Sequence, residues 1–373
     1  MIRRLHALAL ACAFLGAFAM AQEYGDFDLR LDVNVASAEA SIELMRGLAG
    51  SPARIAEMPG SRLALSTTST LAQQPLTLED LERALESAKF NQSLGDDIFR
   101  LAEAKENVAA MSDLLAELRR RNFAQRVVAT VAQIFPAGVR VRTSVPVYVV
   151  AFGYQTVDAY VRRVVWRGNV PAFVGEGEGE VTIIVNLSKA ISYGRSTDER
   201  FVGLLTVVAH EVFHAAFGVF KDSSPAWREY YATNQSYFDQ LVDLSQNEGV
   251  AYYLTMIQRT GGRFSAEGER SIRAAFEEFN RNAEELLHPG IDRRRAWDII
   301  RLSNSSSFWT NYGALAGMVV ARQIDQTLGR AALSETLITG PKAFFNTYVD
   351  LMQRDGSLPQ LSPRIVQALG RRY

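Results

Sequence analysis

The spacing of apolar residues changes several times along this chain of 373 residues. Residues 28–35 alternate between polar and apolar side chains, as in a half-buried strand. Helical spacing follows, first over residues 38–48 and then over residues 77–118. Segments rich in β-branched and aromatic residues begin only after Pro136, and they predict three further strands at 146–152, 160–166 and 181–187.

Beyond Phe201 the apolar positions keep a helical period, and no segment there predicts a strand. We therefore expect an α+β fold. Residues 22–200 form a mixed α/β N-terminal lobe with a small sheet, and residues 201–373 form a mostly helical C-terminal lobe. The hydrophobic composition of 48% is enough for one large domain or two closely packed lobes.

The segment from His210 to His214 has the sequence HEVFH, which matches the pattern HExxH. On a helix, residues i and i+4 lie about 40° apart around the axis, so both imidazoles can reach one metal ion. Glu211 lies about 100° from His210, close enough to hold a water molecule on that metal. The surrounding residues are apolar almost all round, so we expect a buried, zincin-like helix between the two lobes.

Two imidazoles and a carboxylate in a buried helix are unfavourable unless they are paired or bind a metal. A buried histidine pair can also be purely structural, but two of the four histidines in the chain stand in this one motif. We therefore predict that His210 and His214 bind Zn²⁺ and that Glu211 is the catalytic base. Catalytic zinc needs a third protein ligand, which must come from elsewhere in the chain.

Residues 1–21 have the pattern of a secretory signal peptide, with Arg3 and Arg4 before an apolar run and an A-x-A cleavage site before Gln22. A lipoprotein anchored at Cys12 is the alternative. We expect the mature chain to be exported, either to the periplasm or out of the cell, without a transmembrane segment. It would contain no cysteine and carry a net charge of −3, which gives no indication of a nucleic-acid partner.

A second motif lies on a predicted helix downstream, where residues 247–251 have the sequence NEGVA. Together with HExxH, this segment resembles the gluzincin metallopeptidases, in particular the glutamate helix of the aminopeptidase N branch. The resemblance implies that Glu248 is the third zinc ligand. It also implies that Tyr312 is the tyrosine that stabilises the oxyanion. Tyr252 stands where the thermolysin branch carries an aspartate that orients a ligand. The chain is also similar to bacterial domains described as zinc-dependent peptidases.

These observations predict an exported zinc metallopeptidase of the gluzincin type that acts on a peptide or protein substrate. One alternative is a catalytically inactive protein that keeps the metal and serves as a binding or inhibitory protein. The intact HExxH motif argues against it, because a protein without turnover has no chemical need for Glu211. Another alternative is a structural helical export protein, which would bind no stoichiometric metal.

Overall fold

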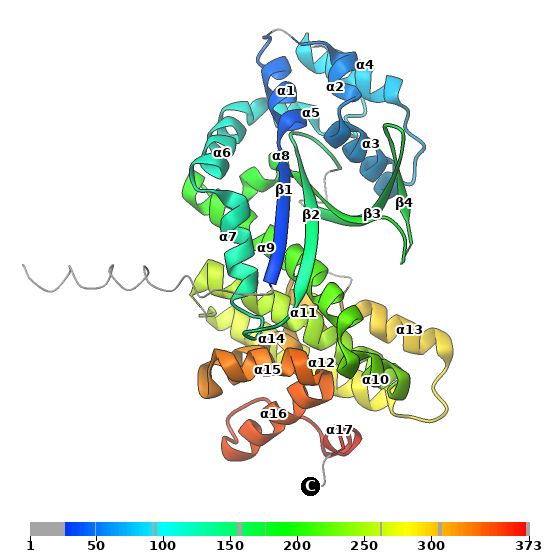
Figure 1. The fold of residues 1–373 in the computed structure, drawn as a ribbon, viewed down its shortest axis with the longest axis vertical. Helices are drawn as coiled ribbons and strands as arrows, with labels where there is room; N and C mark the ends of the chain where they lie inside the picture. Colours follow the sequence, from blue (N-terminus) through cyan, green and yellow to red (C-terminus); the bar gives the residue numbers. More distant parts are fainter. Residues whose placement is uncertain are drawn as a thin grey trace, which may run out of the picture.

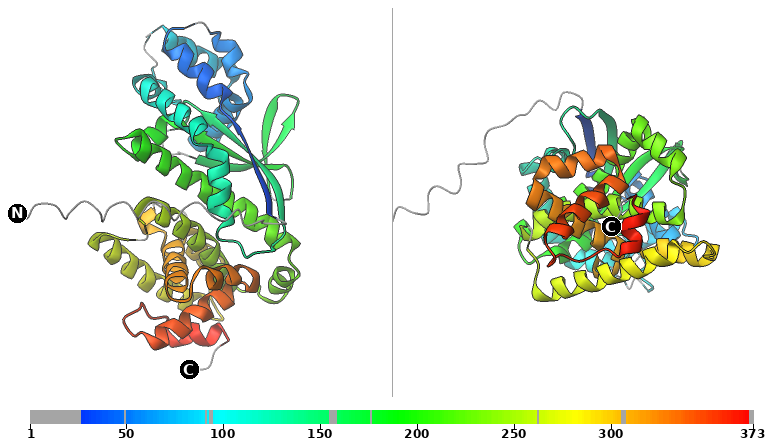
Figure 2. Two further views of the ribbon diagram at one scale, coloured as in Figure 1. Left: turned by 60° about the vertical axis from the view of Figure 1, so that its left-hand side comes forward. Right: turned by 90° about the horizontal axis from the view of Figure 1, so that it is seen from below.

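The computed structural model describes residues 27–48, 50–90, 92, 95–154, 159–175, 177–261, 263–304 and 308–370. The targeting segment predicted at residues 1–21, with Cys12, lies outside these residues. The sheet and the first seven helices occupy one half of the molecule, and α10 to α17 occupy the other half (Figure 1, Figure 2). This arrangement confirms the predicted α+β fold, with a small sheet in the N-terminal part and helices in the C-terminal part.

A mixed five-stranded sheet is the centre of the N-terminal half, with the strand order β1-β2-β5-β3-β4. β1, β2 and β5 are parallel, whereas β3 is antiparallel to both of its neighbours. The strands are β1 (Phe27–Asn34), β2 (Val141–Val150), β3 (Ala159–Arg167), β4 (Val170–Val174) and β5 (Glu180–Asn186). All four predicted strands are present, and β4 is an additional short strand at one edge.

Seven helices connect β1 to its parallel neighbour β2, because two parallel strands cannot be joined by a tight turn. They are α1 (Ala36–Met45), α2 (Pro52–Ala56), α3 (Pro59–Ala72), α4 (Leu78–Lys89), α5 (Leu101–Glu106), α6 (Val108–Arg120) and α7 (Phe123–Ala132). β1 and β2 align Leu31 with Val145 and Val33 with Val147. Val145 and Val147 are buried, so this pair of strands belongs to the core on which the helices pack.

The helix that carries HExxH is α9 (Thr197–Ser223), which follows the short α8 (Leu187–Ala190) and η1 (Ile191–Tyr193). It begins with a capping box, because the hydroxyl of Ser196 accepts from the backbone N–H of Glu199 and the Glu199 carboxylate accepts from the N–H of Ser196. α9 packs on β2, β5, α6 and α7 from one side and on α11 from the other. The predicted position of this helix between the two halves is therefore correct.

Burial explains why α9 is so apolar. Among the described residues it is the one helix with the length and hydropathy of a membrane span, and 56% of its most apolar window is buried inside the protein. Phe213, Phe217 and Phe220 gather around Phe135, which follows α7, with ring centroids 5.8 to 6.4 Å apart. These rings fix one side of α9, so that its polar residues face the other side.

The C-terminal half consists of helices that pack on one another. They are α10 (Pro225–Thr233), α11 (Tyr237–Thr260), α12 (Ala266–Leu286), α13 (Arg293–Leu302), η2 (Phe308–Thr310), α14 (Tyr312–Leu328), α15 (Arg330–Thr339), α16 (Pro341–Arg354) and α17 (Pro363–Ala368). α11 and α14 have the most extensive contact of any two elements in the described chain. α11 therefore lies between α9 and α14, and it carries the second motif.

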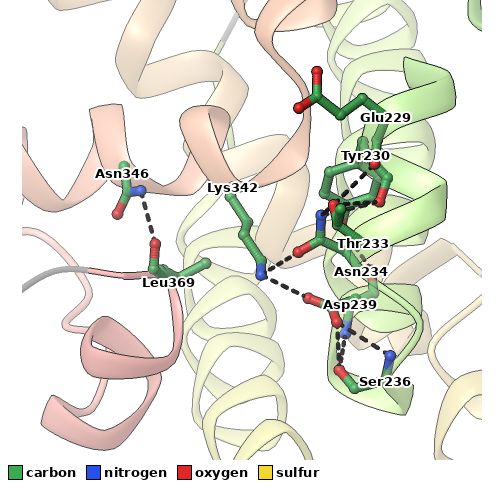
Figure 3. Close-up of polar contacts among 9 residues, drawn as sticks. All are labelled: Glu229, Tyr230, Thr233, Asn234, Ser236, Asp239, Lys342, Asn346 and Leu369. Atoms are coloured by element: carbon green, nitrogen blue, oxygen red, sulfur yellow. Dashed lines mark hydrogen bonds and ion pairs between the residues drawn. The ribbon is translucent and has the colours of Figure 1, made fainter. Parts of the chain in front are cut away.

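Polar contacts fix the start of α11 against α16 (Figure 3). The ammonium of Lys342 lies 3.0 Å from a carboxylate oxygen of Asp239 and also donates to the side-chain oxygen of Asn234. Asp239 accepts from the N–H and the hydroxyl of Ser236 in the capping box of α11. The first turn of α11 is therefore stabilised by its own capping box and by an ion pair with α16.

Candidate metal centre

His210, Glu211 and His214 lie on the one face of α9 that the core does not cover. Val208 and Val212 are fully buried on the opposite face. The side chains of His210 and His214 keep 16% and 20% of their surface exposed, so solvent reaches both imidazoles. Their Nε2 atoms lie 3.1 Å apart, which shows that the i, i+4 spacing turns both rings toward one point. The ligand atoms of all three residues lie within 4.8 Å of one another.

α11 runs antiparallel to α9 and brings Glu248 to the two histidines. Lys221 pairs with Asp243 at one end of the contact, and His210 lies against Tyr252 nearer the other end. Between these contacts, the Oε2 atom of Glu248 lies 3.6 Å from Nε2 of His210 and 3.4 Å from Nε2 of His214. The two motifs, which are 33 residues apart in the sequence, therefore meet in the fold.

Asn247 orients one of the two imidazoles. Its side-chain oxygen lies 3.1 Å from Nδ1 of His214, so that Nδ1 carries the proton and donates it to the amide oxygen. When the ring is neutral, Nε2 of His214 is then the nitrogen with a lone pair, on the side of Glu248 and His210. A metal-binding histidine needs this arrangement, because the hydrogen bond at the far nitrogen fixes both the tautomer and the ring orientation.

Charge also favours a cation at this point. Burial alone would lower the pKa of the His214 imidazole, but the Glu248 carboxylate beside it, together with Glu211, raises this pKa to about 9. Burial alone would raise the pKa of Glu248, whereas His214, His210 and a hydrogen bond from Asn304 hold it below its usual value. Glu248 is therefore a carboxylate at neutral pH, and it attracts positive charge to the point where the imidazoles meet.

Three donor atoms, Nε2 of His210, Nε2 of His214 and Oε2 of Glu248, form a donor triangle whose size fits a zinc ion. Two donors that are each about 2.1 Å from one tetrahedral ion lie about 3.4 Å apart. The three separations found here are 3.1, 3.4 and 3.6 Å. Two imidazole nitrogens and one carboxylate oxygen are also a donor set that catalytic zinc uses, with a fourth position left for water or substrate. The residues present therefore fit Zn²⁺.

A second polar pair borders the histidines. The ring of Tyr252 lies with its centroid 5.4 Å from that of His210, and its hydroxyl oxygen accepts a hydrogen bond from the side-chain amide of Asn311. Both residues are buried. Asn311 stands directly before α14, so the start of that helix contacts α11 one turn beyond Glu248. Asn304 and Asn311 were not predicted as site residues, since no sequence spacing places the loop before α14 beside α11.

The structure places the hydroxyl of Tyr312, the predicted oxyanion donor, against α13. Its hydroxyl donates to the backbone carbonyl of Ile299 at 2.5 Å, and the side chain is buried between α13 and α14. Burial and the charges of Glu278 and Glu285, which lie on α12, raise the pKa of this phenol. The catalytic role of Tyr312 stays a prediction from the family resemblance, and its hydroxyl is committed to a structural hydrogen bond.

A mainly helical α+β fold with an HExxH helix and a glutamate from a second helix defines this site as a candidate zinc-peptidase centre. The comparison with protein families agrees: the model of the family described as "Putative zinc dependent peptidase (DUF5700)" matches residues 54–357, and the chain belongs to this family. The match includes both motifs. No curated protein and no solved structure matches the chain.

Proposed function

We propose that this protein is a zinc-dependent peptidase of the gluzincin type, in which His210, His214 and Glu248 hold the ion. One observation carries the proposal: a single oxygen of Glu248 lies 3.6 and 3.4 Å from the Nε2 atoms of both histidines. The two motifs predicted this meeting from the resemblance alone, and the family to which the chain belongs supports the peptidase activity.

Each residue around the site has its own role in the proposed reaction. A bound Zn²⁺ would polarise the substrate carbonyl and lower the pKa of water toward about 7. Glu211 accepts the proton of the attacking water and passes it to the leaving amine, because one of its carboxylate oxygens lies within 4.8 Å of the ligand nitrogens of both histidines. Asn247 keeps His214 in the tautomer that presents Nε2.

The substrate in this proposal is a peptide or protein outside the cytoplasm. Export rests on the sequence of residues 1–21, which has the pattern of a signal peptide. The net charge of −3 expected for the mature chain offers no general attraction for nucleic acid.

The decisive experiment measures metal content and hydrolysis on the same purified protein. We expect one zinc per chain by elemental analysis, hydrolysis of a mixed peptide library, and loss of hydrolysis on treatment with a chelator. One bound zinc without cleavage of any peptide would instead support the inactive binding protein. Absence of stoichiometric metal would exclude both functions.

Two variants distinguish the role of Glu248 as a metal ligand from the role of Glu211 as the catalytic base. Glu248→Gln should lose zinc, whereas Glu211→Gln should keep it and lose about 10²- to 10⁴-fold in kcat. His288→Gln is the matched control, because its Nδ1 accepts from the N–H of Gly290, outside the site. Full activity of Glu211→Gln with bound zinc would contradict the role of Glu211.

A further inference from the structure

A lysine and an aspartate join α9 to α11 beyond the metal-binding residues. The ammonium of Lys221 lies 3.3 Å from Oδ1 of Asp243. Lys221 stands near the end of α9, seven residues after His214. Asp243 stands on α11, four residues before Asn247 and therefore on the same face of that helix. The two side chains keep only 13% and 19% of their surface exposed, so this ion pair is mostly shielded from water.

Three aromatic rings surround the ammonium of Lys221. It lies 5.0 Å from the ring centroid of Phe217, 4.9 Å from that of Trp227 and 5.7 Å from that of Tyr231. A cation is attracted by the face of an aromatic ring over distances up to about 6 Å. Phe217 belongs to α9 itself, whereas Trp227 and Tyr231 belong to α10, the helix that connects α9 to α11. α10 therefore supplies two of the three rings around an ion pair between the helices that it connects.

The tryptophan of α10 is itself held in place. Trp227 is buried, and its indole N–H donates to the backbone carbonyl of Leu337 on α15 at 2.8 Å. The ring centroids of Trp227 and Phe217 lie 5.4 Å apart, with the planes nearly perpendicular. Contacts with α9 and α15 thus fix the surroundings of the Lys221 ammonium.

Both oxygens of the Asp243 carboxylate have a partner. Oδ1 faces the ammonium of Lys221, and Oδ2 accepts a hydrogen bond from the hydroxyl of Tyr231 at 2.9 Å. Burial and the charge of Asp243 raise the pKa of this phenol, so its hydroxyl keeps its proton and stays a donor. The carboxylate is therefore held in one orientation, with one oxygen directed at the lysine.

The ion pair continues a row of polar contacts between the two antiparallel helices. One turn beyond Asp243 on α11, the side-chain oxygen of Asn247 lies 3.1 Å from Nδ1 of His214. Glu248 follows directly, with its Oε2 atom 3.4 Å from Nε2 of His214. A shift of α11 along α9 would separate Asp243 from Lys221, and separating two mostly buried charges is costly. The pair therefore favours the register in which Glu248 meets the histidines.

We propose that Lys221 is a positioning residue for the metal centre: through Asp243 it fixes the register of α11 on α9, and with it the position of Glu248 beside the two histidines. The three rings around the ammonium keep water away from the pair, which strengthens the attraction between its charges. This assignment rests on the proposed zinc site. If only a fraction of the molecules has the correct register, the measured Kd for zinc equals the intrinsic Kd divided by that fraction. Lys221 thus acts on zinc affinity without touching the ion.

The test compares two lysine-to-methionine variants of the purified protein. Lys221→Met keeps an apolar side chain of similar length and removes the charge. If about a tenth of the molecules then keep the correct register, the zinc Kd rises about tenfold. Lys342→Met is the matched control, because Lys342 lies 3.0 Å from Asp239 on the same helix but connects α11 to α16 (Figure 3).

Unfolding and zinc binding are measured on both variants. Each variant should lower the midpoint of denaturant unfolding of the metal-free protein, because each loses an ion pair of α11. Only Lys221→Met should weaken zinc binding. Wild-type zinc affinity in folded Lys221→Met, or an equal loss of affinity in both variants, would overturn the proposal.

A milder variant tests the same pair if Lys221→Met does not fold. Tyr231 is 42% exposed, so Tyr231→Phe should fold normally while Asp243 loses one hydrogen bond. We expect its zinc Kd to rise by about two- to fivefold. Tyr230→Phe is the control, since the Tyr230 hydroxyl donates to the backbone carbonyl of Asp239 and not to the ion pair. Equal zinc affinities in these two variants would contradict the role of the pair.

A double variant tests whether Lys221 acts through Asp243. Asp243→Asn should weaken zinc binding as Lys221→Met does, and the double variant should bind no more weakly than the weaker single variant, because the two residues act as one pair. Additive losses would contradict that pathway. Absence of stoichiometric zinc in wild type would overturn the proposed metal site itself, whereas wild-type affinity in Lys221→Met would overturn only the assignment of Lys221.

Discussion

Gly249 on α11 lies directly against Gly317 on α14, backbone to backbone. A Cβ atom on either glycine would fall inside the other helix: one on Gly317 would come within 3.0 Å of the Cα of Gly249 and would overlap the carbonyl of Ser245. Gly249 is the neighbour of Glu248, so this contact sets the position of the third candidate ligand. The absence of a side chain at Gly317 and Gly249 thus allows the two helices to approach closely.

Gly317→Ala should therefore separate α14 from α11. We expect destabilisation of about 1–3 kcal/mol or more, since an added methyl meets rigid backbone and no flexible side chain can give way. Zinc affinity should fall as Glu248 moves with α11. Denaturant unfolding and zinc titration measure the two effects. Gly218→Ala is the control: this glycine lies inside α9, and an added methyl group would find no heavy atom of another element within 4 Å, so alanine should stabilise the helix by up to about 1 kcal/mol.

Zinc should stabilise the folded protein. A metal that binds only the folded state at 100 times its Kd adds about 2.7 kcal/mol to the free energy of unfolding. We expect Tm to rise when zinc is added to chelator-treated wild type, and to stay constant for His210→Ala. His288→Ala should respond like wild type, because His288 lies outside the donor triangle. An equal rise in Tm for His210→Ala would contradict the site.

Asn247→Ala should lower zinc affinity by about 10- to 100-fold, because His214 would lose the hydrogen bond that fixes its tautomer. Competition with a chromophoric chelator measures the change. Asn346→Ala provides the comparison: this asparagine on α16 donates to the carbonyl of Leu369 (Figure 3), far along the chain from either motif, and its loss should leave zinc affinity unchanged. Equal affinities in Asn247→Ala and wild type would remove Asn247 from the site.

Zinc binding should depend on pH through His214. Its pKa is raised to about 9, so between about pH 6.5 and 8 the ring is protonated in the metal-free protein and the ion must displace that proton. Apparent zinc affinity should rise about tenfold for each pH unit in this range. By the same linkage, the raised pKa stabilises the metal-free fold fully below about pH 6.5, and this contribution is lost as pH rises through about 9. Zinc affinity independent of pH over this range would contradict the charged pair of His214 and Glu248.

Local patterns in the sequence predicted most elements of the fold. The alternation at residues 28–35 and the β-branched segments became β1, β2, β3 and β5, because side-chain spacing follows directly from strand geometry. No sequence pattern sets α15, over Arg330–Thr339, apart from its neighbours in the helical C-terminal half. It starts and ends at Gly329 and Gly340, which both have positive φ, and its apolar positions form no clear face.

The candidate site could also be predicted only in part. His210 and His214 could be predicted because their spacing lies within one helix, and Glu248 because of a family motif. The contact between Tyr252 and Asn311 could not be predicted, since it joins residues 59 positions apart and depends on how α14 packs on α11. Spacing along the chain carries no information about such packing. The same reason explains why the sequence could suggest Tyr312 without revealing its bond to Ile299.

Two helices carry the three candidate ligands and their nearest polar neighbours: α9 supplies the histidines and Glu211, and α11 supplies Asn247, Glu248 and Tyr252. Two helices in side-by-side contact can slide along each other or move apart. A small displacement of α11 would therefore move a metal ligand, its orienting amide and a phenol together. The centre would be assembled or dismantled as one unit, so a molecule that wedges the two helices apart would abolish metal binding and turnover in a single step.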